Sequence, residues 1–194
     1  MIESKDDYRF YLDADRIALG IRRKQPLLFQ DEIWRFQRLL RKVEFLENGS
    51  NNFLSQITCL QARFSLLKLS VKLGFTIPRN VFGPGLSIAH RGAIVVLSGT
   101  KVGENCRLNQ GVTIGGSPTW APLIGNNVFI GPGVVIWGDI EIADGIAIGA
   151  NSYVDKSFKD SNITIAGCPA KKVSDKGSEH LWIRATEILR HAVE

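Results

Sequence analysis

The sequence predicts a mainly β protein built on a parallel β-helix, with an α-helical N-terminal part and a helical C-terminal tail. The first observation is a column of aliphatic residues with period six, at Ile124, Ile130, Ile136, Ile142 and Ile148. The second is a column with the same period upstream, at Val96, Val102, Leu108 and Ile114. The third is a small or aliphatic residue four places after most members of both columns, among them Thr100, Cys106, Val112, Val128, Val134, Ile140, Ile146 and Ser152.

Period six matches neither an α-helix, with its period of 3.6, nor an ordinary strand, with its period of 2. It is typical of a coil of short strands joined by turns, and hexapeptide repeats of this kind form parallel β-helices. The phase slips by four residues between Ile114 and Ile124, so a protruding loop is expected within 115–123. A β-sandwich with chance spacing is the alternative, and the length of the two columns disfavours it.

Three helices are expected before the repeat, at about 4–24, 30–47 and 53–73. Ser4 is a candidate N-cap of the first helix, and Pro26 is expected to end it. Gly74 is the predicted stop of the third helix. The boundaries expected from these patterns are an α-helical domain at 1–74, the β-helix at 75–173 and a helical tail at 174–194.

Basic residues are frequent on the helices, and we interpret them as solvated polar faces: Arg35, Arg38, Arg41, Lys42, Arg63, Lys68 and Lys72. The amphipathic stretch 179–193 is expected to form a helix that caps the open end of the coil, where backbone groups lack partners.

The composition is that of a soluble globular protein, with 44% hydrophobic and 22% charged residues among 194. No apolar run approaches the ~18 residues of a spanning helix, and no signal-peptide pattern is present. Three cysteines without metal-ligand spacing suit a reducing cytoplasm, and Cys106 fits a packing role in the repeat. The net charge of +5 comes without a basic stripe interleaved with aromatics, so nucleic acid is disfavoured as a partner, whereas a phosphorylated small molecule stays open.

His90 is the candidate catalytic residue. It lies within the β region and, counted back from Val96, falls in the aliphatic column. A buried imidazole without a partner is costly, so either the coil is irregular at this point or the ring points outward into a groove. Histidine titrates near neutral pH and is suited to act as a general base. His180 and His191 fall in the tail, where a solvent-facing position is expected.

The segment from Phe75 to Val173 resembles the hexapeptide-repeat acyltransferases, and within them the serine acetyltransferase branch. The motifs that carry the resemblance lie in order and in one phase over about half the chain, at 84–92, 94–96, 102–104, 111–116 and 166–171. The resemblance implies a left-handed β-helix assembled as a homotrimer, with active sites between neighbouring coils. It implies acetyl-CoA as co-substrate and His90 as the general base that takes the proton of an acceptor hydroxyl, and no metal is expected.

The resemblance also assigns the contacts of CoA. The pantetheine arm is expected along the edge of the coil, at Gly116, Pro132, Ala150, Ala166 and Gly167. Lys171 and Lys172 are expected to meet the phosphates of CoA, although a solvated turn is the alternative interpretation.

The departures from the serine acetyltransferase pattern bear on the acceptor. Ala89 and Phe75 stand where that branch has two aspartates, one that helps hold the amino acid and one that orients the histidine. The loop that bears an Arg-His pair in the family is about four residues shorter here, and it carries Trp120 and Ala121 in place of the pair. A zwitterion would find few charged partners, whereas Trp120 offers a flat face for a sugar ring.

The predicted activity is therefore acetyl transfer to a hydroxyl of a sugar or polysaccharide precursor, as in acetyltransferases of bacterial capsule assembly. Serine O-acetylation with an altered pocket is one alternative, and a non-catalytic β-helix scaffold is another. Asp13, Asp15 and Glu104 are candidates to reach His90 or the substrate in a trimer, against a plain surface or capping role.

Overall fold

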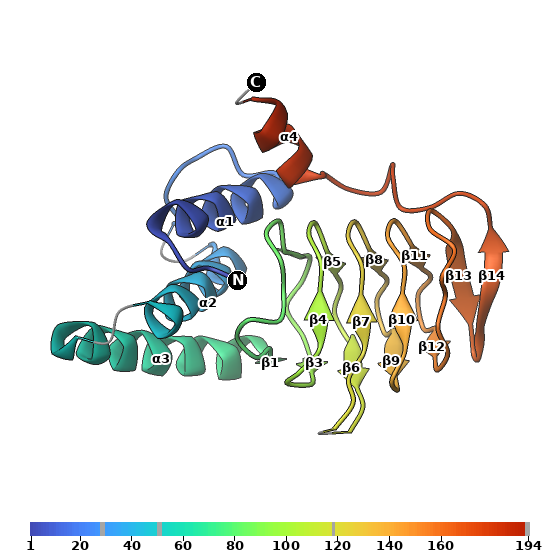
Figure 1. The fold of residues 1–194 in the computed structure, drawn as a ribbon, viewed down its shortest axis with the longest axis horizontal. Coiled ribbons are helices and arrows are strands. Elements are labelled where there is room, and N and C mark those ends of the chain that lie inside the picture. Colours follow the sequence, from blue (N-terminus) through green and yellow to red (C-terminus); the bar gives the residue numbers. More distant parts are fainter. Residues whose placement is uncertain (28–29, 50–51, 118, 193–194) are drawn as a thin grey trace.

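The structure, a computed structural model, describes residues 1–27, 30–49, 52–117 and 119–192. Three helices stand at one end of a parallel β-helix whose coils follow one another along the long axis of the molecule (Figure 1). The helices are α1 (Lys5–Ala18), α2 (Glu32–Asn48) and α3 (Phe53–Leu73), and a short α4 (Ala185–His191) follows the coil. The predicted fold class, a β-helix of about five coils with an α-helical N-terminal part and a helical C-terminal tail, is confirmed.

The β-helix has three faces, each a sheet of short strands, which we name A, B and C. Sheet A contains β1 (Phe75–Thr76), β3 (Ile94–Val96), β6 (Thr113–Gly115), β9 (Val135–Trp137) and β12 (Tyr153–Val154). Sheet B contains β4 (Lys101–Val102), β7 (Leu123–Ile124) and β10 (Glu141–Ile142). Sheet C contains β2 (Ser87–Ile88), β5 (Arg107–Leu108), β8 (Phe129–Ile130), β11 (Ala147–Ile148), β13 (Thr164–Gly167) and β14 (Ala170–Ser174). All strand pairs are parallel except β13–β14, an antiparallel hairpin that closes the last coil.

The aliphatic columns form the core, as the repeat predicts. Every residue of the two columns is buried, and equivalent residues of successive coils stack in register, for example Leu108 beside Ile130 and Ile130 beside Ile148. The expected loop also forms after β6, where Ser117 and Trp120 exchange backbone hydrogen bonds of 3.1 Å. Pro118, in the same loop, lies outside the described residues.

Asparagine and glycine form the corners because the chain there takes left-handed backbone angles. At the corner between sheets B and C, Asn105, Asn127 and Asn162 have φ of 52°, 57° and 57°, and Gly145 has φ of 70°. Asparagine and glycine adopt this region most readily, so the composition of the repeat follows from its geometry.

The helix boundaries differ from the prediction chiefly in α1. Ser4 caps α1 as expected, because its hydroxyl accepts from the Asp7 N–H at 3.0 Å while the Asp7 carboxylate accepts from the Ser4 N–H. The helix ends at Ala18, earlier than predicted from Pro26, because Gly20 turns the chain with φ of 70°. Helix α3 spans the predicted range and ends at Gly74, which has φ of 78°.

Arg41 is fully buried, so its prediction as part of a solvated face is wrong. Its guanidinium donates to the Asp15 carboxylate at 2.9 Å and to the Glu44 carboxylate at 3.0 Å. It also donates to the carbonyls of Phe82 and Gly83, at 2.8 and 2.7 Å. Burial acts to lower the pKa of Arg41, but the two carboxylates hold it above its ordinary value.

Asp15 of α1 and Gln37 of α2 bind backbone groups at the edge where the first coil meets the helices. Asp15 accepts from the backbone N–H groups of Gly85 and Leu86, at 3.0 and 2.9 Å. Gln37 of α2 donates to the Leu86 carbonyl at 2.6 Å and accepts from the Ile88 N–H at 3.4 Å. Backbone groups that the preceding coil satisfies elsewhere in the stack are thus satisfied here by α1 and α2.

The C-terminal tail, predicted to cap the open end of the coil, does not extend over the end formed by β13 and β14. It runs back along the corner between sheets B and C and ends beside α1 (Figure 1). Trp182 donates to the Asn105 carbonyl at 3.1 Å and packs on Phe129, while Thr186 bonds to the Asn105 amide at 2.7 Å. Helix α4 is shorter than the predicted helix of 179–193, whose last residue lies outside the described part. None of the helices seen in the described residues combines the length and the apolar character needed to span a bilayer.

Candidate active site

His90 lies at a corner of the first coil that is wider than its equivalents. Ile88 is in register with Leu108, and Val96 is in register with Ile114. Leu108 and Ile114 are six positions apart, but Ile88 and Val96 are eight apart, so the corner between sheets C and A holds two extra residues. His90 therefore leaves the aliphatic column, and its side chain is exposed. Because the coil is irregular at this point, the imidazole of His90 does not have to be buried without a partner in the apolar core.

The widened corner, residues 89–93, is held by its backbone on both sides. Ala89 donates to the Leu108 carbonyl at 2.8 Å, and Gly92 donates to the Leu73 carbonyl at 3.1 Å. The Ala93 carbonyl in turn accepts from Gly111 of the next coil at 2.7 Å. The backbone that carries His90 is thus anchored to the coil and to the end of α3, while the imidazole has no hydrogen-bond partner in the described part of the chain.

Arg91, next to His90, is tied to the helical layer. Its guanidinium bonds to Glu32 in the first turn of α2, and Lys72 of α3 donates to the same carboxylate at 3.0 Å. The hydrogen bond from Lys72 and the nearby charge of Arg91 hold the pKa of Glu32 below its ordinary value. Sequence reasoning missed Glu32 and Gln37, because nothing in a helical pattern indicates which polar residue meets a distant corner.

Four of the predicted CoA contacts share the corner of His90. Pro132 and Ala150 follow β8 and β11 in sheet C, as His90 follows β2, whereas Ala166 and Gly167 are the last two residues of β13 in the same sheet. Ala150 and Gly167 are exposed. A methyl group added to Gly131 or Gly149 would lie 2.7 Å from the Ile148 carbonyl or 3.0 Å from the Ala166 methyl, so successive coils approach closely at this corner. The corner bears the imidazole at the first coil, Asn109 and Gln110 at the second, and small residues from the third coil onward.

Gly116 and Trp120 lie at a different corner, the one between sheets A and B. A methyl group added to Gly116 would lie 2.7 Å from the Trp120 carbonyl, which accounts for glycine there. Trp120 is 38% exposed. Sheet A separates this corner from the one that bears His90, so a single chain does not bring Trp120 and His90 together.

The two predicted phosphate-binding lysines differ in their surroundings. Lys172 donates to Asp175 at 2.6 Å, and this hydrogen bond raises the pKa of Lys172 above its ordinary value. Lys171 is exposed, pairs across the hairpin with Ala166, and has no acidic partner among the described residues. Of the two lysines, Lys171 is therefore the one whose charge is available to a ligand phosphate beside Ala166 and Gly167.

The candidate acidic residues have other partners. Asp15 is only 2% exposed and its oxygens are bound by Arg41 and two backbone N–H groups, so it is not available to a substrate within this chain. Burial raises the pKa of Asp15, and the charge of Arg41 opposes this effect. Asp13 is exposed and paired with Arg16 at 3.0 Å, and Glu104 is paired with Arg190 at 2.6 Å.

Phe75 and Ala89 occupy the two positions at which the serine acetyltransferase branch has aspartates, and the surroundings of both are consistent with apolar side chains. Phe75 is buried and packs edge-on against Phe36, with ring centroids 5.1 Å apart. Ala89 is half-buried beside His90. Neither position offers a charge to an acceptor.

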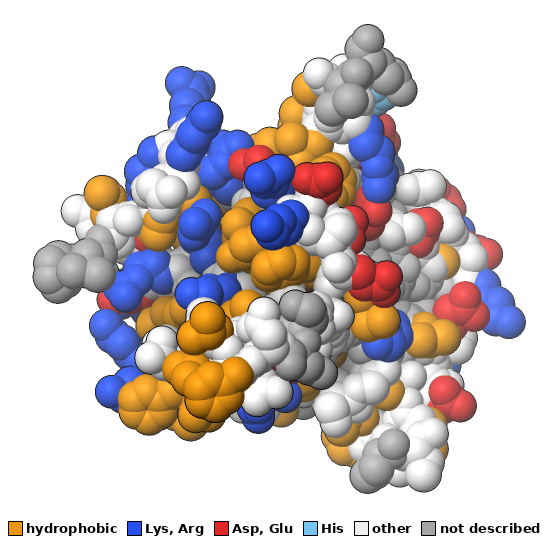
Figure 2. Space-filling model, turned by 60° about the vertical axis from the view of Figure 1, so that its left-hand side comes forward, with side chains coloured by type: hydrophobic (Ala, Val, Ile, Leu, Met, Phe, Trp, Pro, Cys, Tyr) orange, Lys and Arg blue, Asp and Glu red, His pale blue; other side chains and the backbone are white. Residues whose placement is uncertain are grey.

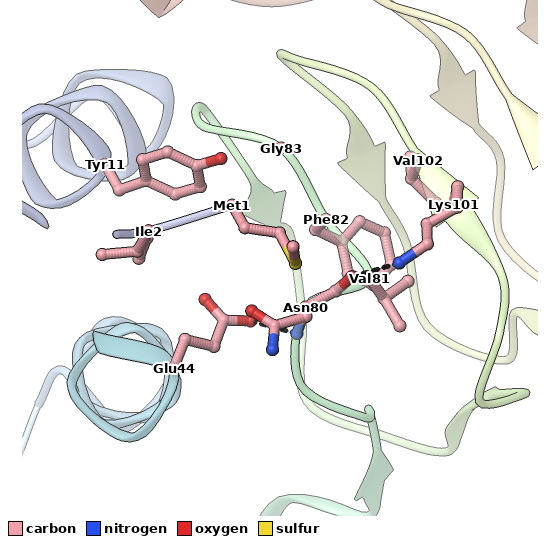
Figure 3. Close-up of a pocket in the computed structure, with 10 residues that line it drawn as sticks. All are labelled: Met1, Ile2, Tyr11, Glu44, Asn80, Val81, Phe82, Gly83, Lys101 and Val102. Atoms are coloured by element: carbon pink, nitrogen blue, oxygen red, sulfur yellow. Dashed lines mark hydrogen bonds between the residues drawn. The ribbon is translucent and has the colours of Figure 1, made fainter. Parts of the chain in front are cut away.

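A cavity of about 350 Å³ lies between α1, α2 and the first coil, away from His90 (Figure 3). Its polar lining is internally paired: Glu44 accepts from the Asn80 N–H at 2.8 Å, and Lys101 donates to the Asn80 carbonyl at 3.2 Å. His90 does not line this cavity, and the candidate active site is the open edge of sheets C and A instead.

Comparison with known proteins points to transferases. Residues 121–156 match the family model described as bacterial transferase hexapeptide (six repeats). A serine acetyltransferase of Buchnera aphidicola from Acyrthosiphon pisum is 36% identical over 110 residues, which cover 54% of this chain and 40% of that protein. The chain thus spans less than half the length of that curated relative.

Solved structures extend the likeness to the N-terminal helices. The crystal structure of serine acetyltransferase from Brucella abortus strain S19 superposes with a TM-score of 0.70 at 26% identity, covering 90% of this chain and 72% of that one. The same protein in complex with coenzyme A gives a TM-score of 0.67 at 26% identity, over 89% and 70% of the two chains. This chain is similar to hexapeptide-repeat transferases, and the names of these relatives are serine acetyltransferase rather than sugar acetyltransferase.

Proposed function

We propose that this chain transfers the acetyl group of acetyl-CoA to a hydroxyl oxygen, with His90 as the general base. The observation that carries the proposal is the exposed imidazole of His90 at the first coil of a corner that carries small residues from the third coil onward. The likeness to a serine acetyltransferase solved with coenzyme A supports acetyl-CoA as co-substrate.

The chain supplies one proton acceptor for a direct transfer. The acceptor hydroxyl gives its proton to an imidazole nitrogen of His90 while its oxygen attacks the thioester carbonyl carbon. The new C–O bond forms, the C–S bond breaks, and the proton on His90 passes to the departing thiolate of CoA. Backbone N–H groups near Gly115 and Gly116 are our candidates to stabilise the oxyanion.

We infer that the active site is completed by a neighbouring copy in a homotrimer. Within one chain Gly116 and Trp120 stand one corner away from His90, across sheet A. Copies placed side by side would set the loop of one chain against the His90 corner of the next. CoA would then lie along Pro132, Ala150, Ala166 and Gly167, with Lys171 near its phosphates.

Serine is the first acceptor to test, because the relatives are named serine acetyltransferases. A sugar hydroxyl is the second candidate, and three residues favour it. Ala89 and Phe75 offer no charge to the ammonium or carboxylate of an amino acid, and burying a zwitterion without partners is costly. Trp120 presents a partly exposed indole on which a sugar ring could stack.

Release of CoA thiol from acetyl-CoA tests the activity, with serine and a panel of sugars as acceptors. We expect His90→Ala to lower turnover by at least ~10²-fold, a typical contribution of a general base. The control is His180→Ala in the exposed tail, which should leave the rate unchanged. Near-normal turnover of His90→Ala would rule out the base, and absence of CoA binding by calorimetry together with absence of turnover would favour a scaffold.

A further inference from the structure

The cavity between α1, α2 and the first coil combines an apolar wall with a few polar side chains. Its volume of about 350 Å³ falls within the ~300–1,000 Å³ range of ligand pockets. Tyr11 of α1, Glu44 of α2 and Lys101 of β4 supply a hydroxyl, a carboxylate and an ammonium (Figure 3). A cavity of this kind can hold an apolar body and orient its polar end. Most of the wall is apolar: Met1, Ile2, Val81, Phe82 and Val102.

Glu44 is a buried carboxylate that can accept further hydrogen bonds. It is 1% exposed, and it accepts from Arg41 at 3.0 Å on one oxygen and from the Asn80 N–H at 2.8 Å on the other. A carboxylate has about four lone-pair sites, so this one has acceptor capacity left. Asp15 accepts from the same guanidinium at 2.9 Å, so two buried carboxylates share one cation. The negative charge at this wall is therefore only partly compensated, and the ammonium of a ligand would complete the compensation.

Lys101 lies on the opposite side of Asn80 from Glu44 (Figure 3). Its ammonium donates to the Asn80 carbonyl at 3.2 Å, and it has no acidic partner among the residues that the structure describes. Lys101 is exposed, so its charge lies at the rim of the cavity, whereas the charge of Glu44 lies inside. Figure 2 shows basic side chains gathered at the helical end of the molecule, which adds to the positive potential outside the cavity. The cavity is thus negative at its inner wall and positive at its rim.

Tyr11 adds a hydroxyl that is free to bond to a ligand. The guanidinium of Arg41 lies over its ring, 4.8 Å from the centroid, and the hydroxyl is turned toward the side of the cavity where Met1 and Gly83 lie (Figure 3). This hydroxyl has no hydrogen-bond partner in the described part of the chain. Burial raises the pKa of Tyr11, so the hydroxyl keeps its proton at neutral pH and can donate. The nearby carbonyls of Phe82 and Gly83, by contrast, already accept from Arg41.

We propose that this cavity binds a free α-amino acid with an apolar side chain. The ammonium bonds to Glu44, the carboxylate faces Lys101 at the rim, and the side chain lies against the apolar wall. An amine without a carboxylate would place a second cation near Lys101, and a carboxylate without an ammonium would meet the buried charge of Glu44. Met1 is 70% exposed, so its side chain is the part of the wall that is freest to move aside for the ligand.

This binding site is separate from the proposed chemistry. His90 does not line the cavity, and the amino acid bound there is not the acceptor of the acetyl group. The ligand would instead touch α1, α2 and the first coil at once, because Tyr11, Glu44 and Lys101 belong to these three parts of the fold. A molecule that binds the folded chain at this junction stabilises the attachment of the helices to the coil by mass action.

Methyl NMR tests where and what the cavity binds. Met1 is the single methionine of the chain, so a carbon-13 label on the methionine methyl gives one resonance, and it reports on the cavity wall. We expect leucine to shift this resonance to saturation. Isoamylamine, which is leucine without its carboxylate, should bind about 2–5-fold more weakly, and 4-methylpentanoate, which is leucine without its ammonium, should give no saturable shift. Equal binding of leucine and isoamylamine, or no shift at about 10 mM leucine, would overturn the proposal.

Calorimetry of leucine binding to three variants tests the two charges. Glu44→Gln keeps the shape of the side chain and should weaken binding at least ~10-fold. Lys101→Ala, at an exposed position where the fold does not depend on the side chain, should weaken it about 2–5-fold and decides the matter if Glu44→Gln lowers the stability. Lys159→Ala, an exposed lysine outside the cavity, is the matched control and should bind as the wild type does.

Unchanged affinity in Glu44→Gln or in Lys101→Ala would contradict the proposed contacts. His90→Ala should bind leucine with the affinity of the wild type, because the imidazole lies outside the cavity. Loss of acetyl transfer and loss of leucine binding are therefore separate outcomes.

Discussion

Replacing Arg41 by methionine tests how α1 and α2 are joined to the first coil. The change keeps an unbranched side chain of similar length but removes the cation from between Asp15 and Glu44, which are 2% and 1% exposed. Removing one partner of a buried ion pair costs about 3–5 kcal/mol, because the remaining charge is left without compensation. For a chain of this size we therefore expect the Tm to fall by about 6–20 °C.

The control and the rescue separate charge from packing. Lys42→Met alters the neighbouring exposed position and should stay within about 0.5 kcal/mol of the wild type. Arg41→Met combined with Asp15→Asn and Glu44→Gln removes the uncompensated charges and should recover about half of the loss or more. Thermal unfolding followed by circular dichroism measures all three variants.

The pH dependence gives a second readout. Burial already raises the pKa of Asp15 in the folded state, and loss of Arg41 removes the charge that opposes this rise. A carboxyl with a raised folded pKa binds its proton more tightly when folded, so its stabilising contribution is present at low pH and lost as pH rises through the folded pKa. The loss of unfolding free energy caused by Arg41→Met should therefore become smaller as the pH is lowered from about 7 to about 5. A deficit below about 1 kcal/mol at neutral pH would refute the role of Arg41 as the shared counter-ion.

Three further changes are predicted from the coil, its tail and its hairpin. Asn151 has φ of 55°, so Asn151→Ala should lower the unfolding free energy by about 1–2 kcal/mol while Asn151→Gly stays close to the wild type in urea titration. Trp182→Ala removes a hydrogen bond and a ring contact that hold the tail, and about 1–3 kcal/mol of local stability should be lost, seen as faster proteolysis after 174 with an unchanged coil. Lys171→Ala should raise the KM for acetyl-CoA about 5–10-fold in a salt-dependent way, whereas Lys172→Ala, whose cation is already paired with an aspartate, should change it less. Equal effects of the two lysines would contradict the assignment of the available charge.

The repeat predicts the coil well because its signal is local and redundant. Each inward residue, such as Ile130 or Ile148, is specified by neighbours six positions away, and the corners between sheets B and C repeat the same left-handed backbone angles. The break in period between Ile88 and Val96 is not visible in the same way, because a two-residue insertion leaves an aliphatic residue, Ile94, near the expected phase.

The helical part is harder to predict because its contacts are distant in sequence. The sequence pattern does not distinguish Arg41 from Arg38. In the structure Arg41 lies on the side of α2 that faces the coil, where it donates to the carbonyls of Phe82 and Gly83. The tail likewise has an amphipathic sequence, but its destination depends on the amide of Asn105 and the ring of Phe129. The assignment of His90 as the general base rests on the resemblance to a family. The structure adds that His90 is exposed and lies at the corner between sheets C and A, with the predicted CoA contacts Pro132 and Ala150.

The way in which Asp15, Gln37 and Arg41 occupy the backbone groups of the first coil has a consequence for how this protein can be divided. A fragment that starts at Phe75 would present a row of bare amides and carbonyls to its surroundings. Such a row templates the addition of further strands, so the fragment is expected to form end-to-end fibres or aggregates where the whole chain does not. The helices therefore prevent other chains from adding strands to the first coil, whatever they contribute to assembly or to catalysis.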